Sequence, residues 1–324
     1  MSYKSPGAES LSAESLSAES LSTKSPSAKS LDTKSRSAKS LQAGPPPVFW
    51  RDSRLPYVEL RKISDARQVC YAPHSHVHWS VGAITSGSST FFYRESTYPI
   101  NAGDLVMMNP DWVHACNPIE NEPWAYLMLY VDAQWLADLR YQIGTLGSPD
   151  WSDIDTAVVS QPALYVHYCE MAACLLDKQC TLSMKHASVT GFLTALMLAL
   201  AHETTVSRPQ PPDGLQAAAA YCDVNAAFDV SLETLCQLTG YSAGHLIRAF
   251  KQHYGLTPHA YLINRRVQLG QRALRQGESI VNAALLAGFN DQPHFQRTFK
   301  RLVAATPNQY RYPLLKQQEN SAGS

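Results

Sequence analysis

The stretch LETLCQLTGYSAGHLIRAFKQHY, from Leu232 to Tyr254, decides the fold of the C-terminal part of the chain. Its apolar residues follow helical spacing on both sides of Gly240, and glycine permits a turn with positive φ. Ser242 follows the turn and can cap the second helix by accepting a backbone N–H. The stretch therefore predicts two short helices joined by a tight turn, which is a helix-turn-helix unit.

The same pattern occurs a second time between residues 280 and 302. Here Gly288 marks the turn, and Asn290 or Asp291 can cap the helix that follows. Thr257-Pro258 lies between the two units and predicts a capped helix with proline in its first turn. We therefore expect two helix-turn-helix units joined rigidly by one long helix.

The charge of this region is strongly basic. Residues 232–316 contain eleven Lys and Arg residues and three Asp and Glu residues, a net charge of +8, whereas the whole chain has a formal net charge of zero. The rest of the chain must then carry −8. Such a basic segment favours binding to the phosphates of nucleic acid.

The two units together resemble the AraC/XylS family of bacterial transcription regulators. The residues that carry the resemblance are Gly240, Ser242, Leu246, Arg248, Phe250, Lys251, Ile280, Ala284, Gly288, Phe289, Phe295, Arg297, Phe299, Lys300, Arg301, Thr306, Pro307, Tyr310 and Arg311. One departure is Ala304, which stands where the family usually has glycine. This substitution predicts that the second recognition helix ends without a residue of positive φ.

The resemblance implies an α+β chain of two domains, with an N-terminal cupin-like β-barrel, dimerisation helices and a C-terminal all-α tandem helix-turn-helix domain. It also implies a cytoplasmic homodimer that regulates transcription, with double-stranded DNA, a small-molecule effector and RNA polymerase as partners. Activation is the expected mode, and the sequence does not distinguish an activator from a repressor. We expect no membrane partner, because the apolar run from Val189 to Ala201 is shorter than the ~20 residues that a bilayer requires.

The resemblance also assigns DNA contacts to the second helix of each unit. These are Gly244, His245, Ile247, Arg248 and Lys251 in the first unit and Gln292, Pro293, Gln296, Arg297, Lys300 and Arg301 in the second. Arg248 and Arg297 occupy matching positions, where a guanidinium can bind a guanine edge or a phosphate. Lys251, Lys300 and Arg301 come later on the helices and are expected to contact phosphates. The phenylalanines nearby follow the buried face and are expected in the core.

Composition and turn signals divide the chain further. Residues 1–47 contain a repeat of five residues rich in Ser, Ala, Glu and Lys, which has nothing to bury and is expected to be disordered, or to precede the native start of translation. The remaining ranges are a cupin-like barrel at 48–131, a helical dimerisation segment at 132–206, a linker at 207–213, the DNA-binding domain at 214–313 and a tail at 314–324.

A group of histidines and aromatic residues in the barrel segment predicts an effector pocket. Its members are His74, His76, His78, Trp79, Tyr93, Trp112, His114 and Trp124. The first three histidines alternate, so on a strand they would point to one face, and His114 could join them. Such a set could hold Zn²⁺ or Fe²⁺. The acidic residue that usually completes a cupin metal site is absent, however, and we expect neither a metal nor another cofactor.

The pocket predicts a small polar effector, anionic or zwitterionic, because imidazole and indole N–H groups can donate to a carboxylate. A weaker resemblance of residues 79–135 to sensors that accompany amino-acid exporters points to an amino acid. Two other functions remain open from the sequence. One is a metal-dependent cupin enzyme with an incidental helical domain, and the other is an architectural DNA-binding protein without an effector. The missing carboxylate and the basic domain favour a regulator without catalytic residues.

Overall fold

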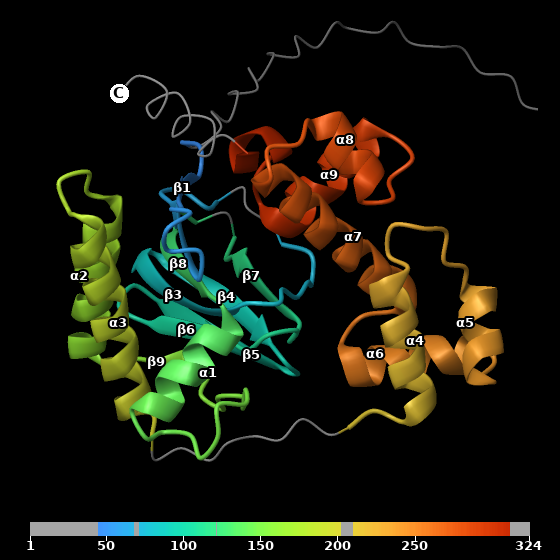
Figure 1. Ribbon diagram of the computed structural model, residues 1–324, viewed down its shortest axis with the longest axis horizontal. Coiled ribbons are helices and arrows are strands. Elements are labelled where there is room, and N and C mark those ends of the chain that lie inside the picture. The colour runs from blue at the N-terminus through green and yellow to red at the C-terminus, as the bar shows by residue number, and fades with distance from the viewer. Residues whose placement is uncertain (1–44, 68–70, 121, 202–209, 312–324) are drawn as a thin grey trace, which may run out of the picture. The chain divides into compact units, whose positions relative to one another are not determined.

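The computed structural model describes residues 45–67, 71–120, 122–201 and 210–311 (Figure 1). The chain divides into residues 1–42 and 43–324, and everything described here lies in the second part. Residues 1–44 of the predicted disordered segment, residues 207–209 of the predicted linker and the predicted C-terminal tail lie outside the described residues.

The strands form two antiparallel sheets. The strands are β1 (Val48–Trp50), β2 (Val58–Ile63), β3 (Trp79–Ser86), β4 (Ser88–Tyr93), β5 (Ser96–Asn101), β6 (Leu105–Met108), β7 (His114–Pro118), β8 (Ala125–Val131) and β9 (Val158–Val159). The larger sheet has the order β1-β2-β8-β3-β6-β9, and the smaller has the order β5-β4-β7. All of these strands except β9 lie within residues 48–131, the segment predicted as a cupin-like barrel.

The side chains of β2 alternate between two apolar clusters, so both faces of the larger sheet are covered. Val58 and Leu60 belong to an apolar cluster that also contains residues of the neighbouring helices, whereas Ile63 belongs to a second cluster between the two sheets. Since alternate residues of a strand share a face, Glu59 and Arg61 point to the same side as Ile63. Two charged residues are thereby directed toward the interior.

Three helices cover the outer face of the larger sheet: α1 (Ala133–Gln142), α2 (Pro162–Leu176) and α3 (Leu182–Ala199). We call strands β1–β9 and helices α1–α3 the sheet domain. Helix α3 contains most of the apolar run that starts at Val189 and begins before it, at Leu182. The reason is a local cap, because the Thr181 side chain accepts the backbone N–H of Met184.

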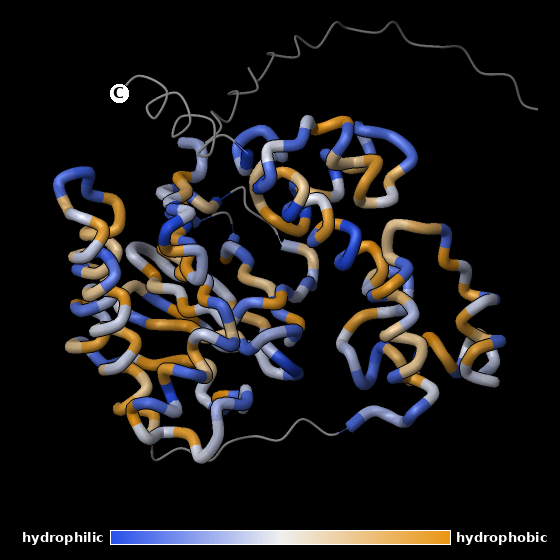
Figure 2. The backbone as a smooth tube through the Cα atoms, in the orientation of Figure 1, coloured by the Kyte–Doolittle hydropathy of each residue, from blue (hydrophilic) through white to orange (hydrophobic). Residues whose placement is uncertain are grey.

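The remaining helices form what we call the helical domain. They are α4 (Asp213–Val224), α5 (Leu232–Thr239), α6 (Ala243–Tyr254), α7 (Pro258–Arg275), α8 (Ile280–Leu286) and α9 (Gln292–Val303). Apolar residues, drawn in orange in Figure 2, run along these helices and along the strands of the sheet domain. The predicted two-domain α+β class is confirmed, with a sheet-rich domain followed by a helical one.

Both predicted helix-turn-helix units are present, with the predicted turn chemistry. Gly240 has φ 70° and Gly288 has φ 76°. The Ser242 side chain accepts the N–H of His245 at the start of α6. Asp291 caps α9 in the same way. Helix α7 joins the units, with Thr257 as its cap and Pro258 in its first turn, as the sequence predicts.

The expectation for Ala304 is wrong. This residue ends α9 with φ 50°, in the left-handed region that was expected to be avoided without glycine. The conformation costs an L-residue roughly 1–2 kcal/mol. The side chain is partly buried against the apolar cluster between the two sheets, so packing of its methyl group offsets the strain.

Candidate functional site

The predicted DNA contacts lie on the exposed faces of α6 and α9. On α6, Gly244, His245, Ile247, Arg248 and Lys251 are exposed, and on α9, Pro293, Arg297, Lys300 and Arg301 are exposed, while Gln292 and Gln296 are partly exposed. The opposite faces of the helices hold Leu246, Phe250, Phe295 and Phe299, which are completely buried, as predicted for the aromatic residues. The structure therefore presents one row of polar and basic side chains from each unit.

An ion network connects β2 to the helical domain. Arg51 binds both carboxylate oxygens of Glu59, with its Nε 2.6 Å from Oε2 and its Nη2 2.9 Å from Oε1. Arg275 of α7 adds a second ion pair, with its Nη2 3.0 Å from the same Oε2. Arg51 also donates to the carbonyl oxygen of Tyr310. Burial would raise the pKa of Glu59, but the two guanidinium groups outweigh it and hold that pKa at about 2.

Polar contacts farther along α7 bind the segment that carries the histidines. The side chain of Asn264 donates to the carbonyl oxygen of Ser75 at 3.1 Å. Arg265 pairs with Asp111 of the sheet domain and with Asp223 of α4, both at 2.7 Å. Helix α7 thus touches the sheet domain along much of its length while it joins the two helix-turn-helix units.

The structure brings His74, His76 and His114 together between the two sheets. The ring centroids of His74 and His114 lie 4.5 Å apart, and those of His76 and His114 lie 4.7 Å apart. The strand expected over residues 74–78 is wrong, because only His74 pairs with His114 in an isolated β-bridge. Residues 75–78 belong to no strand, and the Asn264 side chain donates to the carbonyl oxygen of Ser75.

The hydrogen bonds of these three rings fix their tautomer. Each Nδ1 lies within 2.9 Å of a backbone carbonyl oxygen: Ala72 for His74, His78 for His76 and Trp112 for His114. A carbonyl only accepts, so each Nδ1 carries the proton and each Nε2 keeps a lone pair. Burial lowers the pKa of His74 to about 4 and that of His76 to about 3, and it also lowers that of His114. The cluster is therefore neutral at pH 7.

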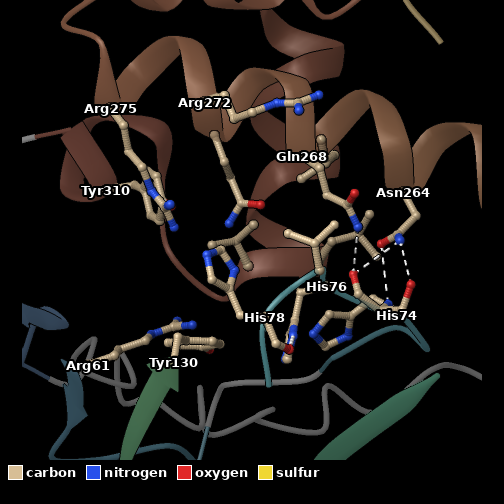
Figure 3. Close-up of a pocket in the computed structure, with 16 residues that line it drawn as sticks. Arg61, His74, His76, His78, Tyr130, Asn264, Gln268, Arg272, Arg275 and Tyr310 are labelled. Atoms are coloured by element: carbon tan, nitrogen blue, oxygen red, sulfur yellow. Dashed lines mark hydrogen bonds between the residues drawn. The ribbon is translucent and has the colours of Figure 1, made fainter. Parts of the chain in front are cut away.

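Two cavities lie beside the histidines. The inner one, lined by His74, His76, His114 and Trp124, has a volume of only about 20 Å³, which suits about one water molecule. The outer one has a volume of about 100 Å³ and lies between the histidine segment and α7 (Figure 3). His74, His76 and Tyr130 line both cavities. Of the two cavities that His74 and His76 line, the one beside α7 is therefore the larger. A further cavity of about 250 Å³ is lined by residues that include Glu59, His78 and Arg275.

The other predicted pocket residues are placed apart from one another. His78 lines the outer cavity. Trp79 is buried in the apolar cluster on the helix-covered face of the larger sheet. The Tyr93 hydroxyl accepts from the backbone N–H of Asn109, and the Trp112 indole donates to Asp153. Trp79, Tyr93 and Trp112 line neither of these two cavities.

Sequence reasoning missed the residues that give the outer cavity its charge, namely Arg61, Arg272 and Arg275. Figure 3 shows Arg272 and Arg275 on α7 and Arg61 beside Tyr130 on the sheet side. A usable signal was present in the strand sequence, because Glu59 and Arg61 alternate with Val58 and Leu60 in a strand with both faces covered. Charged residues in such a strand need partners.

Within the described part of the chain, no group of three or more His, Cys, Asp or Glu side chains is arranged to hold a metal ion. Over the same residues, no helix is long and apolar enough to cross a membrane.

Comparison with known proteins places both domains. Residues 56–215 match a family model described as an AraC-like ligand binding domain, and residues 235–312 match one described as a helix-turn-helix domain. YbfI of Bacillus subtilis strain 168, an uncharacterized HTH-type transcriptional regulator, is 30% identical over 228 residues, which cover 68% of this chain and 80% of the relative. The HTH-type transcriptional activator RhaS of Pectobacterium carotovorum is 20% identical over 281 residues, covering 78% of this chain and 91% of the relative.

A solved structure supports the fold alone. The crystal structure of ToxT from Vibrio cholerae O395 aligns with a TM-score of 0.51 at 12% sequence identity, covering 79% of this chain and 96% of that one. The order of a sheet-rich domain before a helical one is therefore shared with an experimentally solved protein.

Proposed function

The chain belongs to the AraC family of transcriptional regulators, and on this basis we propose that it binds a specific promoter site through α6 and α9 in response to a small polar molecule. The observation that carries the proposal is the pair of capped helix-turn-helix units whose second helices expose Arg248 and Arg297 at matching positions. A guanidinium in such a place can read guanine in the major groove.

The effector binds in the outer cavity between the histidine segment and α7. The position supports control of DNA binding, because α7 joins the two helix-turn-helix units and lines the cavity with Asn264, Gln268, Arg272 and Arg275. A molecule that contacts both domains can bind one arrangement of them more tightly than another, which is the requirement for shifting an equilibrium. We infer a polar effector, and an amino acid fits the mixture of guanidinium, amide and imidazole groups.

The regulator acts in the cytoplasm as a homodimer. Helices α2 and α3 expose Val166, Met184 and Leu198, each about half accessible, which favours their use as a dimer contact. An activator also contacts RNA polymerase, and the relative RhaS, named as an activator, supports this mode of action for the chain. The relatives are named as regulators, so we propose no catalytic activity.

The test is selection of genomic DNA fragments by the purified full-length protein, followed by sequencing. We expect enrichment of a small set of promoter fragments that share two similar half-sites, because a homodimer presents two copies of each reading helix. The Arg248→Ala/Arg297→Ala double variant is expected to lose this enrichment and to keep its fold, since both side chains are exposed. Equal enrichment by the double variant would contradict the assigned reading surface.

A further inference from the structure

Arg61 is a buried cation that the protein leaves partly without hydrogen bonds. Only 2% of the residue is exposed, yet its Nε and Nη2 have no hydrogen-bond partner among the described residues. Its guanidinium carbon lies 5.4 Å from the centroid of the Phe49 ring, which attracts a cation through its face but leaves these N–H groups unpaired. A buried donor without a partner costs free energy, and a buried charge costs more, unless something outside the chain completes it.

Another arginine of the chain shows which group can bind to the Nε and Nη2 side of a guanidinium. Arg51 lies on the adjacent part of the sheet domain and uses its own Nε and Nη2 to hold both oxygens of the Glu59 carboxylate. This parallel pair of donors matches the two oxygens of a carboxylate. In Arg61 the same pair of nitrogens is buried without a hydrogen-bond partner among the described residues, and the residue lines the outer cavity.

The other residues around the cavity cannot supply the missing anion. Its lining includes Arg61, Arg272 and Arg275 and contains neither Asp nor Glu. The groups that act most strongly to raise the pKa of Arg61 against its burial are the phenols of Tyr71, Tyr126 and Tyr130. Burial also raises the pKa of each of these phenols, so they are uncharged at neutral pH. The cavity therefore keeps an uncompensated positive charge.

We propose that Arg61 is the anchor of a carboxylate-binding subsite and that the effector of this protein is a small organic acid held by a two-pronged contact to Nε and Nη2. This inference rests on the proposed function for the presence of an effector and specifies its chemical class. The charge and the shape of the open edge both lead to it, because a carboxylate neutralises the guanidinium and fills both donors.

The rest of the outer cavity indicates what surrounds the carboxylate. Leu302, Val303 and Val267 supply apolar surface at one side. His76 also lines the cavity, and its Nε2 lone pair, which lies 3.4 Å from the Ser80 hydroxyl, can accept from an N–H or O–H of the ligand if that ligand replaces this long contact. A short organic acid with one further hydrogen-bond donor fits these groups, whereas inorganic phosphate has no apolar part to contact Val267, Leu302 and Val303.

The experiment measures thermal unfolding of the full chain and of two variants. Arg61→Met removes the buried cation, and Arg54→Met removes an exposed one, whose side chain is 69% accessible. Without added ligand, Arg61→Met is expected to melt at the same temperature as the unsubstituted protein or above it, because an unpaired buried charge is lost. A drop of several degrees would show that the protein itself satisfies Arg61, and would overturn the inference.

The second arm adds probes at millimolar concentration: the L-amino acids, acetate, lactate and succinate, the amides of the same acids, and inorganic phosphate. At least one free acid is expected to raise the melting temperature of the unsubstituted protein and of Arg54→Met, with no effect on Arg61→Met and none from the matching amide. Stabilisation of Arg61→Met by the same acid, stabilisation by amides or phosphate alone, or no stabilisation by any acid would contradict the subsite.

These outcomes are separate from those of the proposed function. Failure to enrich any genomic fragment would remove the proposed regulator even if the acid still binds through Arg61. Suppose instead that enrichment is lost in the Arg248→Ala/Arg297→Ala variant and that no acid changes the melting temperature. This result would support the proposed regulatory function and contradict the carboxylate subsite.

Discussion

Glu59 and Arg61 lie two residues apart on β2, and both carry a buried charge, but within the described part of the chain only Glu59 has oppositely charged partners. At Glu59 the carboxylate is completely buried and is matched by Arg51 and Arg275 from two different parts of the chain. At Arg61 a guanidinium is also buried, yet two of its nitrogens have no hydrogen-bond partner among the described residues. The first place is complete without a ligand and the second is not, which separates a structural contact from a binding site.

The helical domain repeats this contrast. Arg265 is largely buried and is held by Asp111 and Asp223. Arg297 is exposed on α9, where its guanidinium faces solvent. In each domain, then, one arginine is used by the protein's own carboxylates, and we propose that another binds an external anion, a carboxylate in one domain and DNA in the other.

The largest effect is expected at the complete site. Glu59→Gln keeps the shape of the side chain but leaves Arg51 and Arg275 buried without their anion, and breaking a buried pair in this way costs about 3–5 kcal/mol. Chemical denaturation of the full chain should show this loss. The matched control is Asp52→Asn, whose partner Arg54 is exposed, and an exposed pair of this kind is worth at most about 1 kcal/mol. Equal losses of stability in the two variants would show that the buried Glu59 pair contributes no more than an exposed ion pair.

The histidine cluster and Glu59 should affect stability in different pH ranges. Burial lowers the pKa of His74 to about 4 and of His76 to about 3, from 6.5, and the pKa values of His78 and His114 are also lowered. Unfolded histidine therefore takes up protons first, so stability is complete above pH 6.5 and falls as pH decreases toward 4. Each imidazole adds a slope of about 1.4 kcal/mol per pH unit.

Glu59 acts in a lower window. Its pKa is lowered from 4.5 to about 2, so its contribution is present above pH 4.5 and is lost as pH falls from there to 2. Melting temperatures measured between pH 6.5 and 4.5 should depend less steeply on pH in His76→Gln than in the unsubstituted protein. In Glu59→Gln the slope of melting temperature against pH should be unchanged over this range. A smaller slope of melting temperature against pH for Glu59→Gln in this range would mean that Glu59 and the histidines titrate together.

The smallest effects concern DNA. Arg297→Ala should weaken binding to the specific site by about 1–3 kcal/mol and relax sequence preference there, because a bidentate contact to a base is lost. Lys300→Ala, later on the same helix, should lower affinity for all sequences alike and reduce the salt dependence of binding. Gel-shift titrations with specific and scrambled DNA measure both. Unchanged affinity and preference in Arg297→Ala would show that this exposed guanidinium does not read DNA.

The helical domain was predictable almost in full because its signals are local. Gly240, Ser242, Thr257 and Gly288 each act within one turn of the helix that they begin or end. Ala304 was the exception, since its left-handed conformation is stabilised by packing against distant strands. A contact of that kind leaves no mark in the neighbouring sequence.

The effector site was predictable only in part for the same reason. The sequence grouped His74, His76 and His114 correctly, but through a strand that the structure does not contain; an isolated bridge between His74 and His114 brings the segments together. Arg61 meets α7 residues only through the tertiary fold, and its unpaired nitrogens become visible only when every neighbour is placed. The aromatic residues Trp79 and Trp112 were grouped with the pocket by type, but each packs where its strand or turn directs it.

The most direct test of the whole account is the affinity for the enriched promoter fragment, measured by gel shift with and without the acid that stabilises the protein, for the unsubstituted chain and for Arg61→Met. The account predicts that the acid changes the Kd of the unsubstituted protein by about 5-fold or more, the range of a typical coupling free energy, and leaves that of Arg61→Met unchanged. The same change in both proteins, or no change in either, would contradict it.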